Sequence, residues 1–294
     1  MKRIISVVSV FVLCGFLMGV SGGTYIALGP EPYPTDKVSF PDYDPEPEAV
    51  SPGEVATYRA YWNGIPAVTA KLEVTSHPDR EDWICAGAKG SIFGQVSTLY
   101  KARDSVHSCM NAETLKPDTY SISIDESLVK YNMLVDFNHE EGTAFRKKIY
   151  PDHESTKDFT FTNAYGPVST YLLIRSLSWE PGDKRRFEVI DGNDRYLLVL
   201  KAVGEEKIKV KTGTYDCVIF ETSIFEGPSD HEREDGAWWE KIKRREQEKI
   251  GMIREVHVWM AKEKPRHIIK AEADVFFGSV TLKLLELSDS SPSM

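Results

Sequence analysis

Alternating apolar and polar positions recur along most of the chain after residue 54, and they predict strands joined by tight turns. In 55–62 the alternation leads into Asn63-Gly64, a strong signal for a two-residue hairpin turn. Asp191–Asp194 and Thr212-Gly213 mark further turns between apolar stretches. The expected strands are 55–62, 65–75, 82–90, 102–110, 119–124, 128–137, 144–149, 158–162, 186–190, 195–203, 207–211, 215–225, 253–260, 267–277 and 278–287.

One segment, residues 166–180, departs from this pattern and predicts a helix. Gly166 suits the N-cap, and Pro167 suits the first helical position because an N–H there would be unpaired anyway. Apolar residues then point to nearly every side, which is typical of a buried helix. Pro181-Gly182-Asp183 is expected to end it. We therefore predict a mainly β protein: a single antiparallel curled sheet, or an open or half barrel, with one buried central helix at about 166–180.

The first residues have the layout of a secretory signal: Lys2-Arg3, an apolar run over 4–20, and small residues after it. Cleavage near 21–23, an uncleaved N-terminal anchor and lipidation at Cys14 remain as alternatives. Each predicts an exported protein of the periplasm or outer envelope, soluble or tethered to the membrane at its N-terminus. The expected divisions are a signal peptide or anchor at 1–23, an acidic Pro-rich linker at 24–53, a β-rich domain at 54–288 with a charged insertion at 226–250, and a polar tail at 289–294.

Charge and motif content argue against several functions. The net charge is −9, and loss of Lys2 and Arg3 with a signal peptide would take it to −11, which disfavours binding to nucleic acid or to anionic lipid head groups. After residue 23 the chain has no G-x-S-x-G, H-E-x-x-H or C-x-x-C motif and no phosphate-binding glycine loop, and its seven histidines are scattered. We therefore predict no catalytic residue, metal ligand or cofactor.

Three cysteines follow the signal segment: Cys85, Cys109 and Cys217. In an oxidising compartment Cys85 and Cys109 are candidates for a disulfide, and the alternative is three buried thiols that pack as small apolar side chains. His107 lies two residues before Cys109, so a strand would place both on one face. A nucleophile and base would also need a third, orienting group, and none is evident.

Aromatic residues concentrate in the expected strands and at the helix. Most are expected to fill the core, but a curled sheet around an apolar helix also suits a small-ligand site. The candidate binding residues are Tyr100, Tyr171, Arg175, Trp62 and Trp259.

Arg175 is the one charge in the expected helix before Glu180. A cation desolvated there needs a carboxylate or several carbonyl acceptors, and Asp183 and Asp104 are candidate partners. In the alternative interpretation, Arg175 faces a cleft and holds an anionic substrate.

Several short segments, taken in order, carry a family resemblance. The central one is Ser-x-x-x-x-x-Arg-Ser-Leu at Ser169–Leu177, followed by Gly182-Asp183. The others are 58–65, 99–104, 115–117, 258–260, 265–268 and 278–280. Together they resemble the bacterial domain-of-unknown-function family 3108 over residues 55–287. Two features depart from that family: Lys262-Glu263-Lys264 stands where an acidic residue is usual before a basic-Pro turn, and 226–250 looks like an insertion.

The resemblance implies an exported, β-rich envelope protein without an established activity, and more loosely the open barrels of periplasmic lipoprotein carriers. We expect a non-enzymatic binding module for an apolar or amphipathic ligand or for a partner protein. One rival is a hydrolase or transferase with an unfamiliar site around Arg175 and His107, and a second is a scaffold with a filled core. The expected partners are a lipid or another envelope protein.

Overall fold

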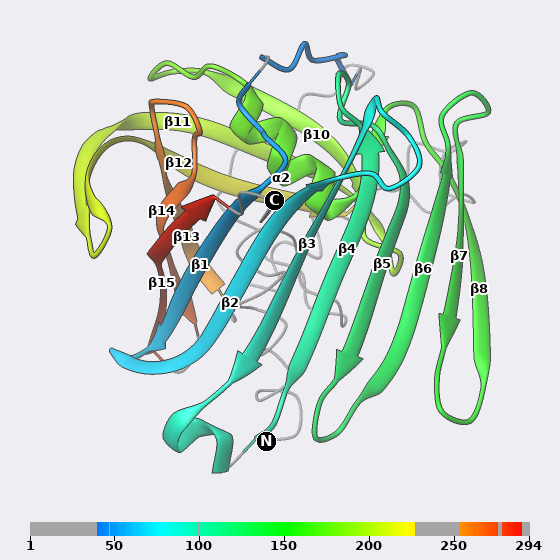
Figure 1. The fold of residues 1–294 in the computed structure, drawn as a ribbon, viewed down its shortest axis with the longest axis horizontal. Helices are drawn as coiled ribbons and strands as arrows, with labels where there is room; N and C mark the ends of the chain where they lie inside the picture. Colours follow the sequence, from blue (N-terminus) through cyan, green and yellow to red (C-terminus); the bar gives the residue numbers. More distant parts are fainter. Residues whose placement is uncertain (1–39, 47, 99, 227–252, 276–277, 290–294) are drawn as a thin grey trace.

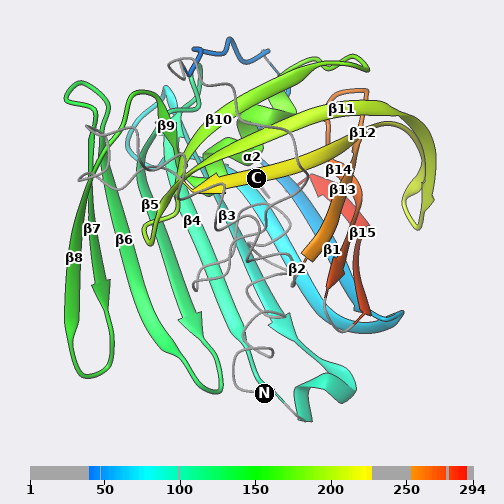
Figure 2. The same ribbon diagram turned by 180° about the vertical axis from the view of Figure 1, so that it is seen from behind.

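The computed structural model describes residues 40–46, 48–98, 100–226, 253–275 and 278–289. Within these residues, fifteen strands form one curled sheet, and one α-helix lies on its concave side (Figures 1 and 2). The predicted fold, a single unclosed antiparallel sheet around a central helix, is therefore confirmed. The expected signal segment at 1–23 lies outside the described residues, and so do all but the first residue of the charged insertion at 226–250 and of the tail at 289–294.

Most strands lie where the sequence predicts them, but the strand predicted at 158–162 spans Glu154–Thr160, and the short strand Ala164–Tyr165 was not predicted. Predicted strands 195–203 and 207–211 form one continuous strand with a register shift between Ala202 and Gly204. The strands are β1 (Glu54–Trp62), β2 (Ile65–Ser76), β3 (Trp83–Ile92), β4 (Arg103–Asn111), β5 (Pro117–Asp125), β6 (Lys130–Asn138), β7 (Thr143–Ile149), β8 (Glu154–Thr160), β9 (Ala164–Tyr165), β10 (Lys184–Ile190), β11 (Arg195–Val210), β12 (Gly213–Glu226), β13 (Ile253–Ala261), β14 (Ile268–Val275) and β15 (Gly278–Asp289). A short 3₁₀ helix, η2, spans Gly94–Thr98.

The first and last strands meet in the middle of the sheet. The order is β8-β7-β6-β5-β4-β3-β2-β1-β15-β14-β13-β12-β11-β10-β9, antiparallel except where β9 joins β10. Each half is thus a meander of neighbouring strands, and the pairing of β1 with β15 joins the halves. Strand β6 shows the period-two rule plainly: its buried residues alternate with exposed ones from Lys130 to Asn138.

The sheet stays open between its edge strands, but a turn lies across the gap. The turn between β10 and β11 reaches β8 through Lys157, whose Nζ donates to the carbonyl of Asn193 at 2.6 Å. Arg195 donates from Nη1 to the carbonyl of Thr160 at 3.0 Å. Strand β8, at one edge, therefore contacts the β10–β11 turn and the start of β11 through side chains, whereas no backbone ladder joins β8 to β9 in the described residues.

Helix α2 spans Pro167–Ser176 and begins where the sequence predicts, with Gly166 as N-cap and proline in the first turn. It ends four residues before the predicted limit, because Leu177 already has extended backbone angles. The ring of Phe137 and the Cβ of Tyr120 lie against Gly166, so the N-terminus of α2 packs on the concave face of β5 and β6. None of the described helices combines the length and apolar character needed to cross a bilayer.

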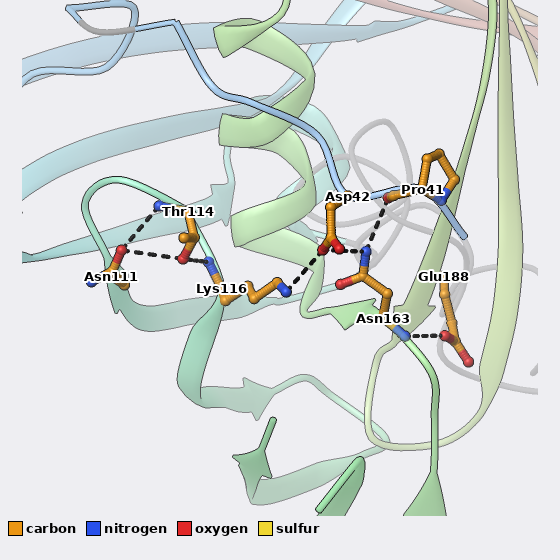
Figure 3. Close-up of polar contacts among 7 residues, drawn as sticks. All are labelled: Pro41, Asp42, Asn111, Thr114, Lys116, Asn163 and Glu188. Atoms are coloured by element: carbon orange, nitrogen blue, oxygen red, sulfur yellow. Dashed lines mark hydrogen bonds and ion pairs between the residues drawn. The ribbon is translucent and has the colours of Figure 1, made fainter. Parts of the chain in front are cut away.

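Residues 40–46 belong to the proline-rich stretch expected to be a linker, and they lie against the domain. Tyr43 exchanges hydrogen bonds with the backbone of Arg186, and its ring lies 5.0 Å from that of Phe187. Asp42 pairs with Lys116 at 3.0 Å and accepts from Asn163 Nδ2 at 3.1 Å (Figure 3). This strap is extended, as a proline-rich sequence predicts, but side-chain contacts hold it on the sheet.

Candidate functional site

A buried polar cluster lies between helix α2 and the start of β1. Arg175 is fully buried, and its Nη1 lies 2.7 Å from Oε1 of Glu54. Its Nε donates to the carbonyl of Arg266 at 3.1 Å. Tyr171 and Tyr58, also buried, bring their hydroxyls within 3.4 Å of each other. The predicted need for a carboxylate is met, but the partner is Glu54, so both proposed partners were wrong.

Those two aspartates have other roles. Asp183 accepts from the backbone of Glu180 at 3.0 Å, and Asp104 accepts from the backbone of Asp125 at 3.2 Å. Glu54 escaped notice because it stands at the expected domain boundary. Its even spacing from Ala56 and Tyr58 was the available signal, since the period of a strand places all three on one face.

The cluster continues to the strap and the β13–β14 connection. Nδ1 of His267 lies 3.4 Å from Glu54, and burial, followed by the nearby charge of Arg175, lowers the pKa of His267 to about 3. His267 is therefore neutral near pH 7. Arg266 pairs with Glu46 at 2.9 Å, and the backbone N–H of Glu46 donates to the carbonyl of Ser176. These contacts give the cluster a structural role, because each buried charge has a partner within the fold.

A second polar group lies on the concave face where β4 begins and β5 ends. The hydroxyl of Tyr100 donates to Glu126, and Asp104 lies beside Glu126. Burial is the main cause that raises the pKa of Asp104 to about 6 and that of Glu126 to about 7. The two carboxyl groups can share one proton near neutral pH. Sequence reasoning placed Glu126 in a turn and missed this pair.

The two candidate tryptophans lie on opposite faces of the sheet. Trp62 shares its face with Tyr58, which contacts the helix, but it stands at the other end of β1. Trp259 is buried on the convex face, where its Nε1 donates to Glu206 at 2.7 Å and Nζ of Lys270 lies 4.1 Å from its ring centroid. The five candidate binding residues therefore do not form one site, although Tyr171 and Arg175 do lie together.

Cys85 and Cys109 are joined by a disulfide across β3 and β4. A ligand atom of His77 lies within 4.8 Å of both sulfurs. Because each sulfur is bonded to the other, neither is available as a thiolate ligand. Cys217 is a buried free thiol, whose pKa burial raises to about 12.

Apolar side chains line the concave face of β4, β5 and β6. The cross-strand register aligns them in rows, for example Val106 with Ile122 and Ile122 with Met133. The face continues past the end of the sheet that α2 crosses (Figures 1 and 2). Its buried members include Val106, Ile122, Ile124, Tyr131, Met133 and Val135.

A family described as "Protein of unknown function (DUF3108)" matches residues 57–285. The chain belongs to this family. That membership confirms the resemblance carried by the ordered segments and spans both halves of the sheet. The DUF3108 chain has no match among curated proteins.

Solved structures show the fold to which this DUF3108 chain is similar. A β-barrel-like protein of domain of unknown function DUF1849 from Brucella abortus is 9% identical, with a TM-score of 0.51 over 80% of this chain and 96% of that one. A Bacteroides fragilis protein, provisionally described as exported with a YmcC-like fold, is 8% identical at a TM-score of 0.35 over 83% and 99%. A Parabacteroides distasonis chain, provisionally described as a lipoprotein, is 9% identical at 0.35 over 83% and 97%. The Brucella structure supports the fold alone.

Proposed function

We propose that this DUF3108 protein is an exported, non-enzymatic envelope protein that binds an apolar or amphipathic molecule on the concave face of its sheet. The observation that carries the proposal is the set of apolar rows on β4, β5 and β6, which continues beyond the end that α2 crosses. Ligand sites in proteins are typically concave surfaces with mostly apolar side chains and few polar groups.

The contacts of the candidate catalytic groups argue against the enzymatic rival. Arg175 is held by Glu54 on the concave side. His107 lies on the convex face, because it alternates with Ser108, whose cross-strand partner Tyr120 packs under the helix. An active site built from Arg175 and His107 would have to reach across the sheet. A partner protein or a filled scaffold remains as an outcome of the binding test.

The proposal is tested with a fluorescent amphiphile, dansyl-labelled undecanoic acid, titrated into the purified protein. We expect saturable binding with a blue-shifted emission, because the dansyl group moves from water to an apolar environment. Met133→Gln should raise the Kd about tenfold, since it places an amide among the concave rows. Leu134→Gln is the matched control: it is the next residue of β6, 42% exposed on the convex face, and should bind as wild type.

Circular dichroism and a urea titration of each variant separate loss of binding from loss of fold. A folded wild-type protein with no blue shift would overturn the ligand proposal and favour the partner or scaffold interpretation. Equal weakening by Met133→Gln and Leu134→Gln would mean that the probe does not bind the concave face.

Export is tested separately. The signal-like pattern of Lys2-Arg3 and the apolar run supports it, and so does the disulfide, since disulfides persist in oxidising compartments. A reporter that is active only outside the cytoplasm, fused at Gly29, should be active. A silent but stably expressed fusion would contradict the proposed compartment.

A further inference from the structure

The buried cations of the described residues fall into two groups. Four lysine and arginine residues are buried there: Arg146, Lys148, Arg175 and Arg266. Arg175 pairs with Glu54 at 2.7 Å, and Arg266 pairs with Glu46 at 2.9 Å. Arg146 and Lys148 have no carboxylate within ion-pair distance in that part of the chain. A buried cation without an anion is costly, so the burial of these two charges requires an explanation.

Arg146 is the less satisfied of the pair. It is 8% exposed, its Nη1 donates to Ser155 Oγ at 3.1 Å, and its Nε, like Nη2 of Arg175, is buried without a hydrogen-bond partner. Directly opposite it on β8 is Lys157, another cation. Like charges at directly opposed positions destabilise a sheet, so this arrangement is unfavourable within the protein alone.

Lys148 stands two residues further along β7 and therefore on the same face. Its Nζ donates to Asn193 Oδ1 at 3.1 Å and lies 3.8 Å from the ring centroid of Tyr131. Neutral partners thus solvate this ammonium, but they do not neutralise it. Lys157 differs, because Asp194 lies 3.6 Å from its Nζ.

The same register places these cations beside the apolar rows. Arg146 is opposite Val135, and Lys148 is opposite Met133, both on the concave face of β6. From β7 across β6 and β5 to β4 the face extends for about 14 Å, given the usual spacing of strands. A positively charged column therefore borders an apolar row, and the β10–β11 turn packs on the part of that row at Met133 and Val135, where a Cβ on Gly192 would lie 2.6 Å and 2.9 Å from their side chains.

We infer that Arg146 and Lys148 bind the anionic head group, a carboxylate or phosphate, of an amphipathic molecule whose apolar part lies along β6, β5 and β4. The inference rests on the proposed function and adds the chemical class of the ligand. An arginine fork matches carboxylate and phosphate oxygens, and Lys148 supplies a point charge beside it. The anion would give the unpartnered Arg146 Nε a hydrogen-bond acceptor and offset the repulsion from Lys157.

The test compares dansyl-labelled undecanoic acid with its methyl ester, which has the same chain and no charge. We expect the acid to bind about tenfold more tightly than the ester, as charge-assisted hydrogen bonds predict. Arg146→Met and Lys148→Met should each abolish most of this difference and leave ester binding unchanged. Lys147→Met is the matched control: it removes the same charge from the convex face of the same strand, where Lys147 pairs with Glu154 at 2.8 Å.

Each outcome supports or overturns the inference. Equal affinity for acid and ester, or full acid binding by folded Arg146→Met and Lys148→Met proteins, overturns it and leaves the proposed function standing. If the folded wild-type protein binds neither the acid nor the ester, the proposed function is overturned, and this inference with it. If inorganic phosphate displaces the acid at equal concentration, Arg146 and Lys148 form a site for free anions. That result would overturn the inference that the ligand is an amphiphile.

Discussion

Arg175 and Arg146 are both buried on the concave side of one sheet, yet their surroundings differ. Around Arg175 the fold supplies Glu54 and a backbone carbonyl. Around Arg146 it supplies a serine hydroxyl and an opposing lysine. Burial alone therefore does not identify a binding residue. A buried cation with its own carboxylate holds the fold together, whereas one without any is suited to an anion from outside.

The carboxyl pair of Asp104 and Glu126 differs from both arginines in how its charge can be neutralised. It also places like charges together on the concave face, but an acid can take up a proton and become neutral, as the raised pKa values of both groups indicate. Arginine has no such route, because its guanidinium stays protonated in proteins. The acidic pair therefore needs only a proton, whereas the charge of Arg146 can be neutralised only by an anion.

The largest expected effect is that of Arg175→Met. It removes the charge, keeps much of the aliphatic bulk and leaves Glu54 buried without its cation. Breaking a buried pair in this way typically costs about 3–5 kcal/mol, so the urea midpoint should fall sharply. A midpoint unchanged from wild type, with loss of amphiphile binding, would instead make Arg175 a ligand residue.

Removal of the disulfide should cause the second-largest loss of stability. The bond links β3 to β4 at a sequence separation of 24, and in the chain-entropy account such a loop contributes about 3 kcal/mol. The double variant Cys85→Ser, Cys109→Ser should lose about this much in urea unfolding, while Cys217→Ser, which removes the free thiol, serves as the comparison. Mass mapping without reduction checks the pairing, and two free thiols there would contradict it.

A smaller effect is expected from pH at the carboxyl pair. The folded pKa values lie above the ordinary carboxyl range near 4, so the folded state holds the protons more tightly than the unfolded chain. Their stabilising contribution is full below about pH 4 and is lost as pH rises through 6–7, with a slope of about 1.4 kcal/mol per unit for each proton.

Urea unfolding at pH 5 and pH 8 measures this dependence. Glu126→Gln keeps a neutral side chain at all pH values and should reduce this dependence, while the buried Asp191, whose pKa burial also raises to about 7, continues to contribute to it. If the variant retains the full wild-type slope between these pH values, the pair is not the source.

Arg146→Met should change the urea unfolding midpoint least, and the direction of that change is informative. Because Arg146 has no carboxylate to lose, an apolar replacement should leave the unfolding midpoint unchanged or slightly raised. The contrast with Arg175→Met, measured in the same urea series, tests the comparison directly. A drop as large as that of Arg175→Met would show that Arg146 is paired within the protein.

Local sequence determined most of the elements of this protein. Alternation and turn residues predicted the strands and their order along the chain, because the two-residue period and turn chemistry act over a few neighbouring positions. Gly166-Pro167 and an apolar circumference predicted a buried helix. The helix pattern also predicted that Arg175 needs an acceptor, since a charge surrounded by apolar positions is desolvated.

Which distant residues meet depends on the tertiary fold. Glu54 lies far from Arg175 in the sequence, and the pairing of β1 with β15 that joins the two halves has no local signal. The period of a strand groups alternate residues, but it does not say which group faces the helix. Trp259 therefore lies on the convex face, and Arg146 on the concave one, because the curl of the whole sheet decides what each face contacts.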